Sequence, residues 1–294
     1  MSSALFTGCA TAIITPFSET GIDYNRLARQ LDRQVCGGVS AIVVCGTTGE
    51  APAVTEEEYP RLLRFCAEQL CGRVCMIAGI GSNNTYSALH RAEIASACGA
   101  DGVLMVTPYY NKTSRQGLIE HFSYVADRSP LPLIIYNVPG RTGIGCTADI
   151  YAELSAHPGI VGVKEASGDF SLFTQTLARC GEELPVWCGN DDQTLAMMSM
   201  GAKGVISVAS NLIPREISTM CAFAAQGRFR EAAQINQRFS GLFRLLFSEV
   251  NPIPVKKAME LMGLDSGLLR LPLCTLDEAK TEALSACLEA LELI

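Results

Sequence analysis

Apolar runs of strand length alternate along this chain with stretches in which apolar residues recur every three or four positions. A short run rich in β-branched residues predicts a buried strand, and the longer spacing predicts an amphipathic helix. In the first unit the strand is Thr11–Pro16 and the helix is Tyr24–Val35. Seven further units follow: Ala41–Cys45 with Thr55–Leu70, Val74–Ile80 with Thr85–Cys98, Gly102–Thr107 with Gln116–Ala126, Pro132–Val138 with Ala148–Ser155, Ile160–Ser167 with Leu172–Cys180, Pro185–Gly189 with Gln193–Met200, and Gly204–Ser210 with Pro214–Ala225.

Eight strands that are apolar along nearly their whole length suit a parallel sheet buried on both faces. Closure at eight predicts an α/β fold of the (β/α)8 TIM-barrel type, which needs about 250 residues or somewhat fewer. A doubly wound open sheet is the alternative architecture. The absence of a GxGxxG motif after the first strand argues against it.

The remainder of the chain predicts a helical appendage. We expect residues 1–226 to form the catalytic barrel and residues 227–294 to form a C-terminal helical domain, with helices over Arg228–Glu249, Pro254–Met262 and Thr275–Leu293. No low-complexity linker separates the two parts, so the helices are expected to pack on the barrel.

Two helices have capping-box spacing at their predicted starts. Thr55 and Glu58 would cap the second barrel helix, where Pro60 could kink the first turns, and Thr275 and Glu278 would cap the last helix.

Composition narrows the function classes. The chain has 294 residues, of which 48% are hydrophobic and 18% charged, with a net charge of −7. An acidic chain without a broad basic surface is a poor partner for nucleic acid or an anionic membrane, which favours small-molecule ligands. No apolar run approaches the roughly 18 residues of a membrane span, and no basic residue precedes Arg26, so we expect a cytoplasmic protein.

The cysteines and histidines do not predict a metal or disulfide site. Thirteen cysteines are scattered without CxxC spacing, and the three histidines (His90, His121 and His157) are far apart. The cysteines are expected to be small core residues.

Lys164 is the candidate with the clearest chemistry, because it lies inside the apolar strand Ile160–Ser167. Burial away from water disfavours the charged form of a lysine and leaves a neutral amine that can attack a carbonyl, as in Schiff-base enzymes. Alternatively, Lys164 extends to the strand end or pairs with Glu165. The other lysines are expected in loops or on polar helical stretches: Lys112, Lys203, Lys256, Lys257 and Lys280.

Polar residues gather where the predicted strands end, which is where barrels of this kind hold their chemistry. Gly46–Glu50 (GTTGE) could cradle a small carboxylate through backbone N–H groups and two hydroxyls, or be an ordinary turn. Arg141 offers a bidentate fork for a carboxylate, or is a solvated surface residue. Tyr109 could be functional or a core tyrosine, and Gly189-Asn190-Asp191 could be only a helix cap.

Six motifs along the chain belong together: GTTGE at Gly46–Glu50, TPYYN at Thr107–Asn111, YNVPGRTG at Tyr136–Gly143, GVKEASG at Gly162–Gly168, GVISV at Gly204–Val208 and NPIPVK at Asn251–Lys256. In combination they resemble the dihydrodipicolinate synthase family of the pyruvate-dependent class I aldolases, a superfamily that includes N-acetylneuraminate lyase. The resemblance runs essentially from end to end. Arg141 and the NPIPVK stretch are more typical of the synthases than of the wider superfamily.

The resemblance implies a complete reaction. Lys164 would form an imine with pyruvate, whose carboxylate Thr47 and Thr48 would hold. The derived enamine would attack L-aspartate 4-semialdehyde to give 4-hydroxy-tetrahydrodipicolinate in diaminopimelate and lysine biosynthesis. No metal or organic cofactor is implied.

The resemblance also assigns the remaining site residues and the assembly. Tyr136, Thr47 and Tyr110 would relay protons, with Tyr110 reaching the site of a neighbouring subunit. Arg141 would orient the semialdehyde carboxylate, and the backbones of Gly189 and Ile206 would line the pyruvate site. The implied assembly is a homotetramer built from two tight dimers.

A regulatory expectation follows from departures from this pattern. Strongly inhibited relatives bind L-lysine at the dimer interface; Asn83 and Tyr109 match that site here. Ser87 replaces a glutamate, and Glu56 and Tyr59 replace two histidines. Losing a carboxylate partner for an ammonium group predicts weak or absent inhibition by L-lysine, although Glu56 could restore part of the binding.

Two other functions stay open. A superfamily enzyme that acts on a sugar acid would use the same Lys164 enamine, but Arg141 argues against it. A non-catalytic keto-acid-binding protein would not need Lys164, Tyr136 and Thr47 together.

Overall fold

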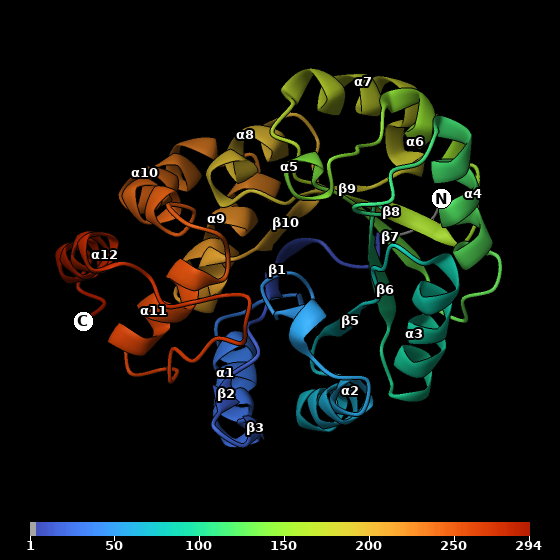
Figure 1. Ribbon diagram of the computed structural model, residues 1–294. Coiled ribbons are helices and arrows are strands. Elements are labelled where there is room, and N and C mark those ends of the chain that lie inside the picture. The colour runs from blue at the N-terminus through green and yellow to red at the C-terminus, as the bar shows by residue number, and fades with distance from the viewer. Residues whose placement is uncertain (1–3) are drawn as a thin grey trace.

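The computed structural model describes residues 4–294, in which eight parallel strands close into a barrel (Figure 1). Neighbouring strands follow the chain order, and β1 closes the barrel by pairing with both β4 and β10. The predicted (β/α)8 barrel is therefore confirmed, and the open doubly wound sheet is wrong. The strands are β1 Gly8–Ala12, β4 Ala41–Val44, β5 Cys75–Gly79, β6 Gly102–Val106, β7 Leu133–Asn137, β8 Ile160–Glu165, β9 Val186–Cys188 and β10 Gly204–Ser207.

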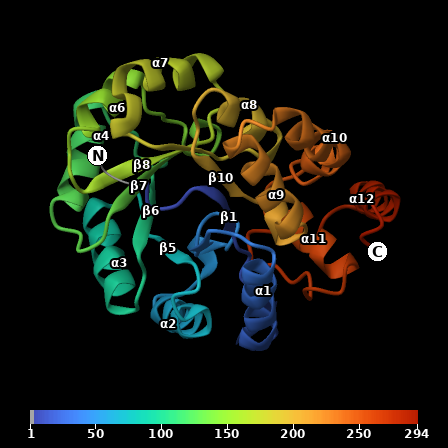
Figure 2. The same ribbon diagram turned by 180° about the vertical axis from the view of Figure 1, so that it is seen from behind.

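A ring of helices surrounds the strands, as the two opposite views show (Figures 1 and 2). Shorter elements lie in the connections between the strands and the ring helices. The ring helices are α1 Tyr24–Cys36, α2 Glu58–Leu70, α3 Thr85–Ala97, α4 Arg115–Ala126, α6 Ala148–Leu154, α7 Phe170–Cys180, α8 Thr194–Ser199 and α9 Pro214–Ala225. The short elements are the hairpin β2 Phe17–Ser18 and β3 Gly21–Ile22, helix α5 Pro139–Thr142, and the 3-10 helices η1 Ala51–Ala53, η2 Gly181–Glu183, η3 Asp191–Gln193 and η4 Ala209–Asn211.

The first strand starts and ends earlier than the predicted Thr11–Pro16. Gly8 already pairs with Gly204, whereas the Ile14 amide leaves the ladder and donates to Asn211 Oδ1 at 3.2 Å. Ile14 is fully buried although it is not in a strand. The apolar run therefore predicts correctly that these residues are buried, but it does not predict which of them pair in the strand.

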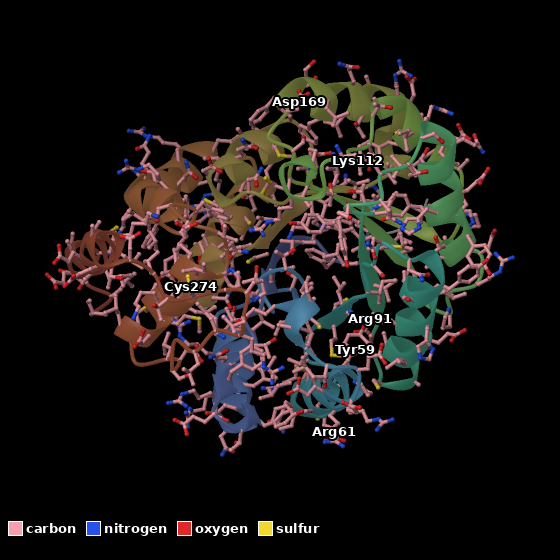
Figure 3. All side chains as sticks on the ribbon, viewed as in Figure 1. Tyr59, Arg61, Arg91, Lys112, Asp169 and Cys274 are labelled. Atoms are coloured by element: carbon pink, nitrogen blue, oxygen red, sulfur yellow. The ribbon has the colours of Figure 1, made fainter. Side chains whose placement is uncertain are left out.

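The core has an inner layer within the barrel and an outer layer between strands and helices. At the amino-terminal end of the strands, Trp187 stacks on Phe6 with ring centroids 4.7 Å apart. Its indole N–H donates to the Phe6 carbonyl at 3.2 Å. On the outside of the ring, the exposed Arg61 of α2 points away from the barrel (Figure 3). Apolar side chains thus fill the amino-terminal end of the barrel, and the polar candidate residues lie at the carboxyl-terminal end.

Three further helices follow the ring: α10 Phe229–Leu245, α11 Ile253–Leu261 and α12 Glu278–Ala290. α10 packs against α9, and α12 packs against both α10 and α11, so the helical part lies on one side of the barrel (Figure 1). The C-terminal helical part is confirmed. The division into residues 1–226 and 227–294 stays a prediction, and residues 1–3 lie outside the described residues.

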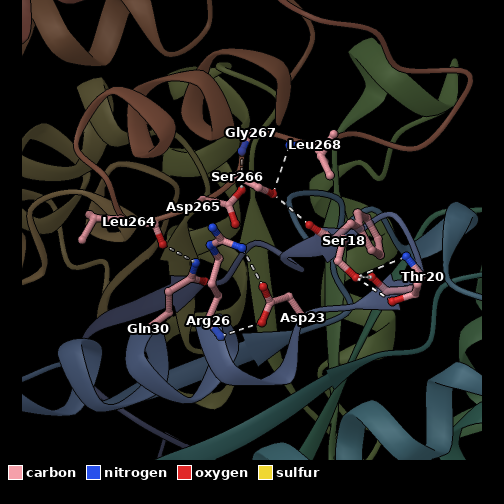
Figure 4. A network of polar contacts seen from close by, with 12 residues as sticks. Ser18, Thr20, Asp23, Arg26, Gln30, Leu264, Asp265, Ser266, Gly267 and Leu268 are labelled. Atoms are coloured by element: carbon pink, nitrogen blue, oxygen red, sulfur yellow. Dashed lines mark hydrogen bonds and ion pairs between the residues drawn. The ribbon is translucent and has the colours of Figure 1, made fainter.

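The segment between α11 and α12 attaches this part to the start of the chain (Figure 4). Ser266 Oγ donates to the Phe17 carbonyl at 2.8 Å, and Gln30 Nε2 donates to the Leu264 carbonyl at 3.4 Å. The segment between the last two helices therefore contacts both the β2–β3 hairpin and α1.

One of the two predicted capping boxes forms. The Thr55 amide donates to Glu58 at 3.0 Å, and the Glu58 amide donates to Thr55 Oγ1 at 3.2 Å. The Thr275 capping box is wrong, because α12 starts at Glu278 and Asp277 caps it by accepting from the Lys280 amide.

Two further expectations concern the burial of the cysteines and the absence of a membrane span. All thirteen cysteines are free thiols, and eight of them are buried, as expected of core residues. For the other five the expectation is wrong, because Cys36, Cys71 and Cys274 are exposed and Cys75 and Cys287 are only partly buried. No helix within residues 4–294 is both long and apolar enough to cross a membrane.

Candidate active site

A cavity of about 500 Å³ opens at the carboxyl ends of the strands. The loops that follow β4, β5, β6 and β7 supply its wall, as expected for a barrel whose chemistry lies at this end. Among the residues that line it are Gly46, Thr47, Gly81, Val106, Tyr136 and Arg141.

Lys164 and Tyr136 form a buried pair beside this cavity. They are direct partners across β8 and β7, and Lys164 Nζ lies 4.2 Å from the centroid of the Tyr136 ring. Lys164 is 5% exposed and Tyr136 is 7% exposed. Tyr136 lines the cavity, whereas Lys164 does not line it but lies against the Tyr136 ring.

Both ordinary interpretations of Lys164 are wrong. Its side chain does not extend to solvent, and the ion pairs found within residues 4–294 do not include it. Glu165 bonds Asn137 and Tyr151 instead. Lys164 is therefore a buried amine without a counter-charge in direct contact.

The GTTGE loop is held in an unusual backbone conformation. Cys45 and Glu50 have φ values of 58° and 53°, in the left-handed region that non-glycine residues rarely occupy. The amides of Gly49 and Glu50 bond within the loop, to Gly46 and Thr47. Within the described residues, the amides of Thr47 and Thr48 have no hydrogen-bond partner. Free amides in a strained loop suit anion binding, so the loop is more than an ordinary turn.

Asn251 connects two of the predicted substrate-binding residues, Thr48 and Arg141. Its amide nitrogen donates to Thr48 Oγ1 at 3.0 Å, and its backbone carbonyl accepts from Arg141 Nη2 at 3.1 Å. Arg141 lies in α5 and is exposed, as a solvated surface arginine would be, but it also lines the cavity. Asn251 was not predicted as a site residue, although the NPIPVK motif contains it.

Lys256 corrects the expectation that Lys164 is the one lysine in apolar surroundings. Lys256 is fully buried on α11, and its Nζ donates to Glu50 Oε1 at 2.7 Å and to the Thr15 carbonyl at 2.9 Å. Burial lowers the pKa of Lys256 below its usual value, and the Glu50 carboxylate acts in the opposite direction. This ion pair ties the GTTGE loop to the C-terminal helices.

Gly189 lies against the Lys164 side chain. A Cβ at position 189 would come within 2.6 Å of Ala166 Cβ and 3.1 Å of Lys164 Cε. Only glycine fits this approach. Ile206 is fully buried inside the barrel and does not line the cavity.

The Gly189-Asn190-Asp191 pattern left open a simple helix cap, but no side chain of this stretch caps the short helix η3 that follows. The Asp191 carboxylate accepts from the Ser207 hydroxyl and from the amides of Val208 and Ala209, at 3.0 Å each for the two amides. Asp191 thus caps η4, at the end of β10, and burial raises the pKa of its carboxyl group.

The two tyrosines after β6 differ in position. Tyr109 is 37% exposed and lines the cavity, so the core interpretation is wrong. Tyr110 is 92% exposed with φ of 69°, and it does not line the cavity of its own chain. The structure of one chain does not bring Tyr110 to the other site residues.

Two of the candidate regulatory residues share the cavity with Tyr109. Glu56 and Ser87 line it, whereas Asn83 contacts Asn111 through its backbone carbonyl at 2.9 Å. Arg91, which the sequence did not single out, also lines the cavity and lies 5.2 Å from the centroid of the Tyr59 ring; both residues are labelled in Figure 3. No cluster suited to a metal ion occurs among residues 4–294.

Comparison with known proteins decides the family. Residues 5–291 match the family model described as the dihydrodipicolinate synthetase family. The chain belongs to this family. A curated relative named 4-hydroxy-tetrahydrodipicolinate synthase, from Clostridium novyi (strain NT), is 42% identical over 285 residues, which cover 97% of this chain and 96% of the relative. The expectation of an enzyme of this family is confirmed.

Solved structures of this family have the same fold. The chloride-inhibited dihydrodipicolinate synthase from Acinetobacter baumannii, complexed with pyruvate, matches with a TM-score of 0.96 and 37% identity, covering 98% of this chain and 99% of that chain. The lysine-bound enzyme from Cyanidioschyzon merolae matches with a TM-score of 0.95 and 37% identity, covering 99% of this chain and 100% of that chain.

Seen as a member of the dihydrodipicolinate synthetase family, the chain assembles most of its predicted site by itself. Lys164, Tyr136, Thr47 and Arg141 converge at or beside the cavity, and Gly189 lies against Lys164. Thr48 is buried and bonded to Asn251. Two predicted residues do not join the cavity: Ile206, which is buried inside the barrel, and Tyr110, which is exposed.

Proposed function

We propose that this enzyme condenses pyruvate with L-aspartate 4-semialdehyde to give 4-hydroxy-tetrahydrodipicolinate, in diaminopimelate and lysine biosynthesis. The observation that carries the proposal is the buried Lys164 amine, which lies on the Tyr136 ring beside a cavity lined by Thr47 and Arg141. A buried amine that no carboxylate holds in an ion pair is free to attack the carbonyl carbon of a keto acid and form a Schiff base.

The first half of the reaction forms an imine. The Lys164 amine attacks the ketone carbon of pyruvate, and the ketone oxygen leaves as water after two proton transfers. The free amides of Thr47 and Thr48 hold the pyruvate carboxylate at the GTTGE loop. The protonated imine then draws electrons from the adjacent methyl group, which loses a proton and becomes the enamine carbon.

The second half forms the carbon–carbon bond. The enamine carbon attacks the aldehyde carbon of the semialdehyde, and the aldehyde oxygen takes a proton. The substrate's own amine next attacks the imine carbon, closes the ring and releases Lys164 as the free amine. Arg141 holds the semialdehyde carboxylate, and Tyr136 and Thr47 relay the protons.

We also propose that Tyr110 completes the proton relay from a second copy of the chain. Its 92% exposure leaves the side chain available to a second copy, and its left-handed φ of 69° supports a functional role, because strained backbone of this kind clusters at functional sites. A homotetramer of two tight dimers would provide the second copy. The location of the enzyme in the cytoplasm stays a prediction.

A coupled assay tests the function. Pyruvate and L-aspartate 4-semialdehyde are supplied together with a downstream reductase, and consumption of the reduced nicotinamide cofactor is followed. We expect turnover only when both substrates are present. Cleavage of a sugar acid to pyruvate, with no turnover of the semialdehyde, would support the sugar-acid alternative instead.

The Arg141→Ala variant is expected to raise the KM for the semialdehyde by roughly 10- to 100-fold, because a charge-assisted hydrogen bond contributes about 1.5 to 3 kcal/mol. Trapping of pyruvate on Lys164 by borohydride should proceed at the wild-type rate, since only the second substrate loses its partner. The measurement compares the two steps in one preparation. If the substitution slows pyruvate trapping as much as it weakens the use of the semialdehyde, Arg141 has a structural role, through its contact with Asn251.

L-Lysine is expected to inhibit this enzyme weakly or not at all. The cavity offers Glu56 as a carboxylate, but Ser87 supplies no charge, and the Arg91 guanidinium in the same wall repels an ammonium group. Titration of L-lysine against the initial rate, at subsaturating pyruvate, measures the effect. Half-inhibition below the millimolar range would contradict the expectation.

A further inference from the structure

The strand positions next to the Lys164–Tyr136 pair hold a second pair that faces the other way. Asn137 and Glu165 are direct partners one step further along β7 and β8. Successive side chains of a strand point to opposite faces of the sheet. Asn137 and Glu165 therefore face the surrounding helices, while Tyr136 and Lys164 face the interior of the barrel.

The outward pair is part of a fully buried polar cluster. The Asn137 amide nitrogen donates to both oxygens of Glu165, at 3.1 and 3.0 Å. The Tyr151 hydroxyl of α6 donates to Glu165 Oε2 at 2.9 Å, and the Ser167 amide donates to Oε1 at 2.7 Å. Asn137, Tyr151 and Glu165 are at most 4% exposed. We call these three residues the outer clamp.

The charge of Glu165 makes the outer clamp unusual. Its two oxygens only accept hydrogen bonds, which is the pattern of an ionised carboxylate. The ion pairs within residues 4–294 include none to Glu165. A buried charge satisfied by neutral donors alone stabilises a fold less than apolar packing would, so general stability is a poor explanation for it.

The clamp also connects to the rest of the site. Asn137 Oδ1 accepts from the Cys146 amide at 3.0 Å, which fixes the chain that leaves Arg141 and α5. The Glu165 carbonyl accepts from the Gly189 amide at 2.7 Å, and Gly189 in turn lies against Lys164. A shift of β8 against β7 would therefore move the amine relative to both Tyr136 and Gly189.

We propose that Glu165 and Asn137 are positioning residues for the reaction, which lock β7 against β8 so that the Lys164 amine and Tyr136 meet the substrate in a fixed geometry. The proposal rests on the proposed function, because it assumes that Lys164 forms the imine. Displacement of a reacting group by about 1 Å can slow a reaction about 100-fold, so a clamp that acts from the opposite face can control the rate.

The decisive variant is Glu165→Gln. The substitution keeps size and shape but replaces one of the two oxygens that accept from the Asn137 NH₂ by an NH₂ group, so two donors face each other at that position. We expect the rate of pyruvate trapping at Lys164, measured by borohydride quenching at a series of times, to fall between about 10- and 100-fold.

The double variant Asn137→Asp with Glu165→Gln provides the rescue. The amide introduced at position 165 would then donate to the carboxylate introduced at position 137, whose other oxygen still accepts from the Cys146 amide, and the Tyr151 hydroxyl can rotate to accept. We expect trapping to recover to within about threefold of wild type, since the two changes compensate only if the residues act as a pair.

A matched control separates positioning from stability. Thr11→Val removes the buried hydrogen bond of 2.7 Å from Thr11 Oγ1 to Gln34 Oε1, which lies outside the proposed site. Thr11→Val should lower the melting temperature as Glu165→Gln does, with the trapping rate unchanged. A double variant as slow as Glu165→Gln, or a control variant that is slowed equally, would overturn the proposal.

A second variant covers the case in which Glu165→Gln does not fold. Tyr151→Phe removes a single donor from the clamp, and we expect trapping about two- to fivefold slower in the folded protein; an unchanged rate would overturn the clamp. Failure of the proposed function is distinguishable, because the wild-type enzyme would then neither trap pyruvate nor turn over both substrates.

Discussion

The Lys164→Ala variant is expected to lose all covalent trapping of pyruvate and to lower kcat at least about 1,000-fold, because the imine that carries both halves of the reaction cannot form. The variant should fold at least as well as the wild type. A buried amine without an ion pair is replaced by a methyl group, which needs no hydrogen-bond partner. Mass spectrometry of the borohydride-reduced adduct locates the lysine, and thermal unfolding measures the stability.

Lys256 and Lys203 are the informative controls for this experiment. Lys256 is also fully buried, but Glu50 and the Thr15 carbonyl hold its amine. Lys203 pairs with Glu182 near the surface. Lys203→Ala should trap pyruvate as the wild type does. An adduct on any lysine other than Lys164 would refute the mechanism.

The sequence predicts the barrel because the strand–helix unit recurs eight times, and because the apolar residues of each unit show locally which of its positions are buried. It also predicts Lys164, because a lysine within an apolar strand stands out locally. Lys256 was missed because the residue that explains it, Glu50, lies 206 positions away. Asn251 was missed as a site residue for the same reason, since its partner Thr48 lies 203 positions away. Pairing over such separations leaves no local pattern.

Where a strand in the structure ends at another residue than predicted, the cause is also a contact between residues far apart in the chain. β10 ends at Ser207, short of the predicted Ser210, because the Asp191 carboxylate caps η4 there. The proposed role of Tyr110 depends on a second copy of the chain, which the sequence suggests only through resemblance. Local patterns thus identify the elements and the proposed nucleophile, whereas contacts between distant segments decide how the site is held.

The second large effect is expected from Lys256→Met, which should lower the free energy of unfolding by about 3 to 5 kcal/mol. The substitution keeps the length of the side chain but leaves the Glu50 carboxylate buried without its cation; Glu50 retains the Arg270 amide at 3.0 Å. Urea denaturation of wild type and variant gives the difference. Lys257→Met is the matched control: its partner Glu260 is 41% exposed, so a loss of at most about 1 kcal/mol is expected.

The same substitution should also change substrate binding, because Glu50 ends the loop that we propose to hold the pyruvate carboxylate. We expect Lys256→Met to raise the KM for pyruvate, and the double variant Lys256→Met with Glu50→Gln to regain most of the stability, since the second change removes the unpaired charge. If the KM recovers together with the stability, the loop needs a neutralised Glu50 and not Lys256 itself. A single variant as stable as Lys257→Met would show instead that water or the loop compensates the charge, and that the C-terminal helices do not secure the loop through this ion pair.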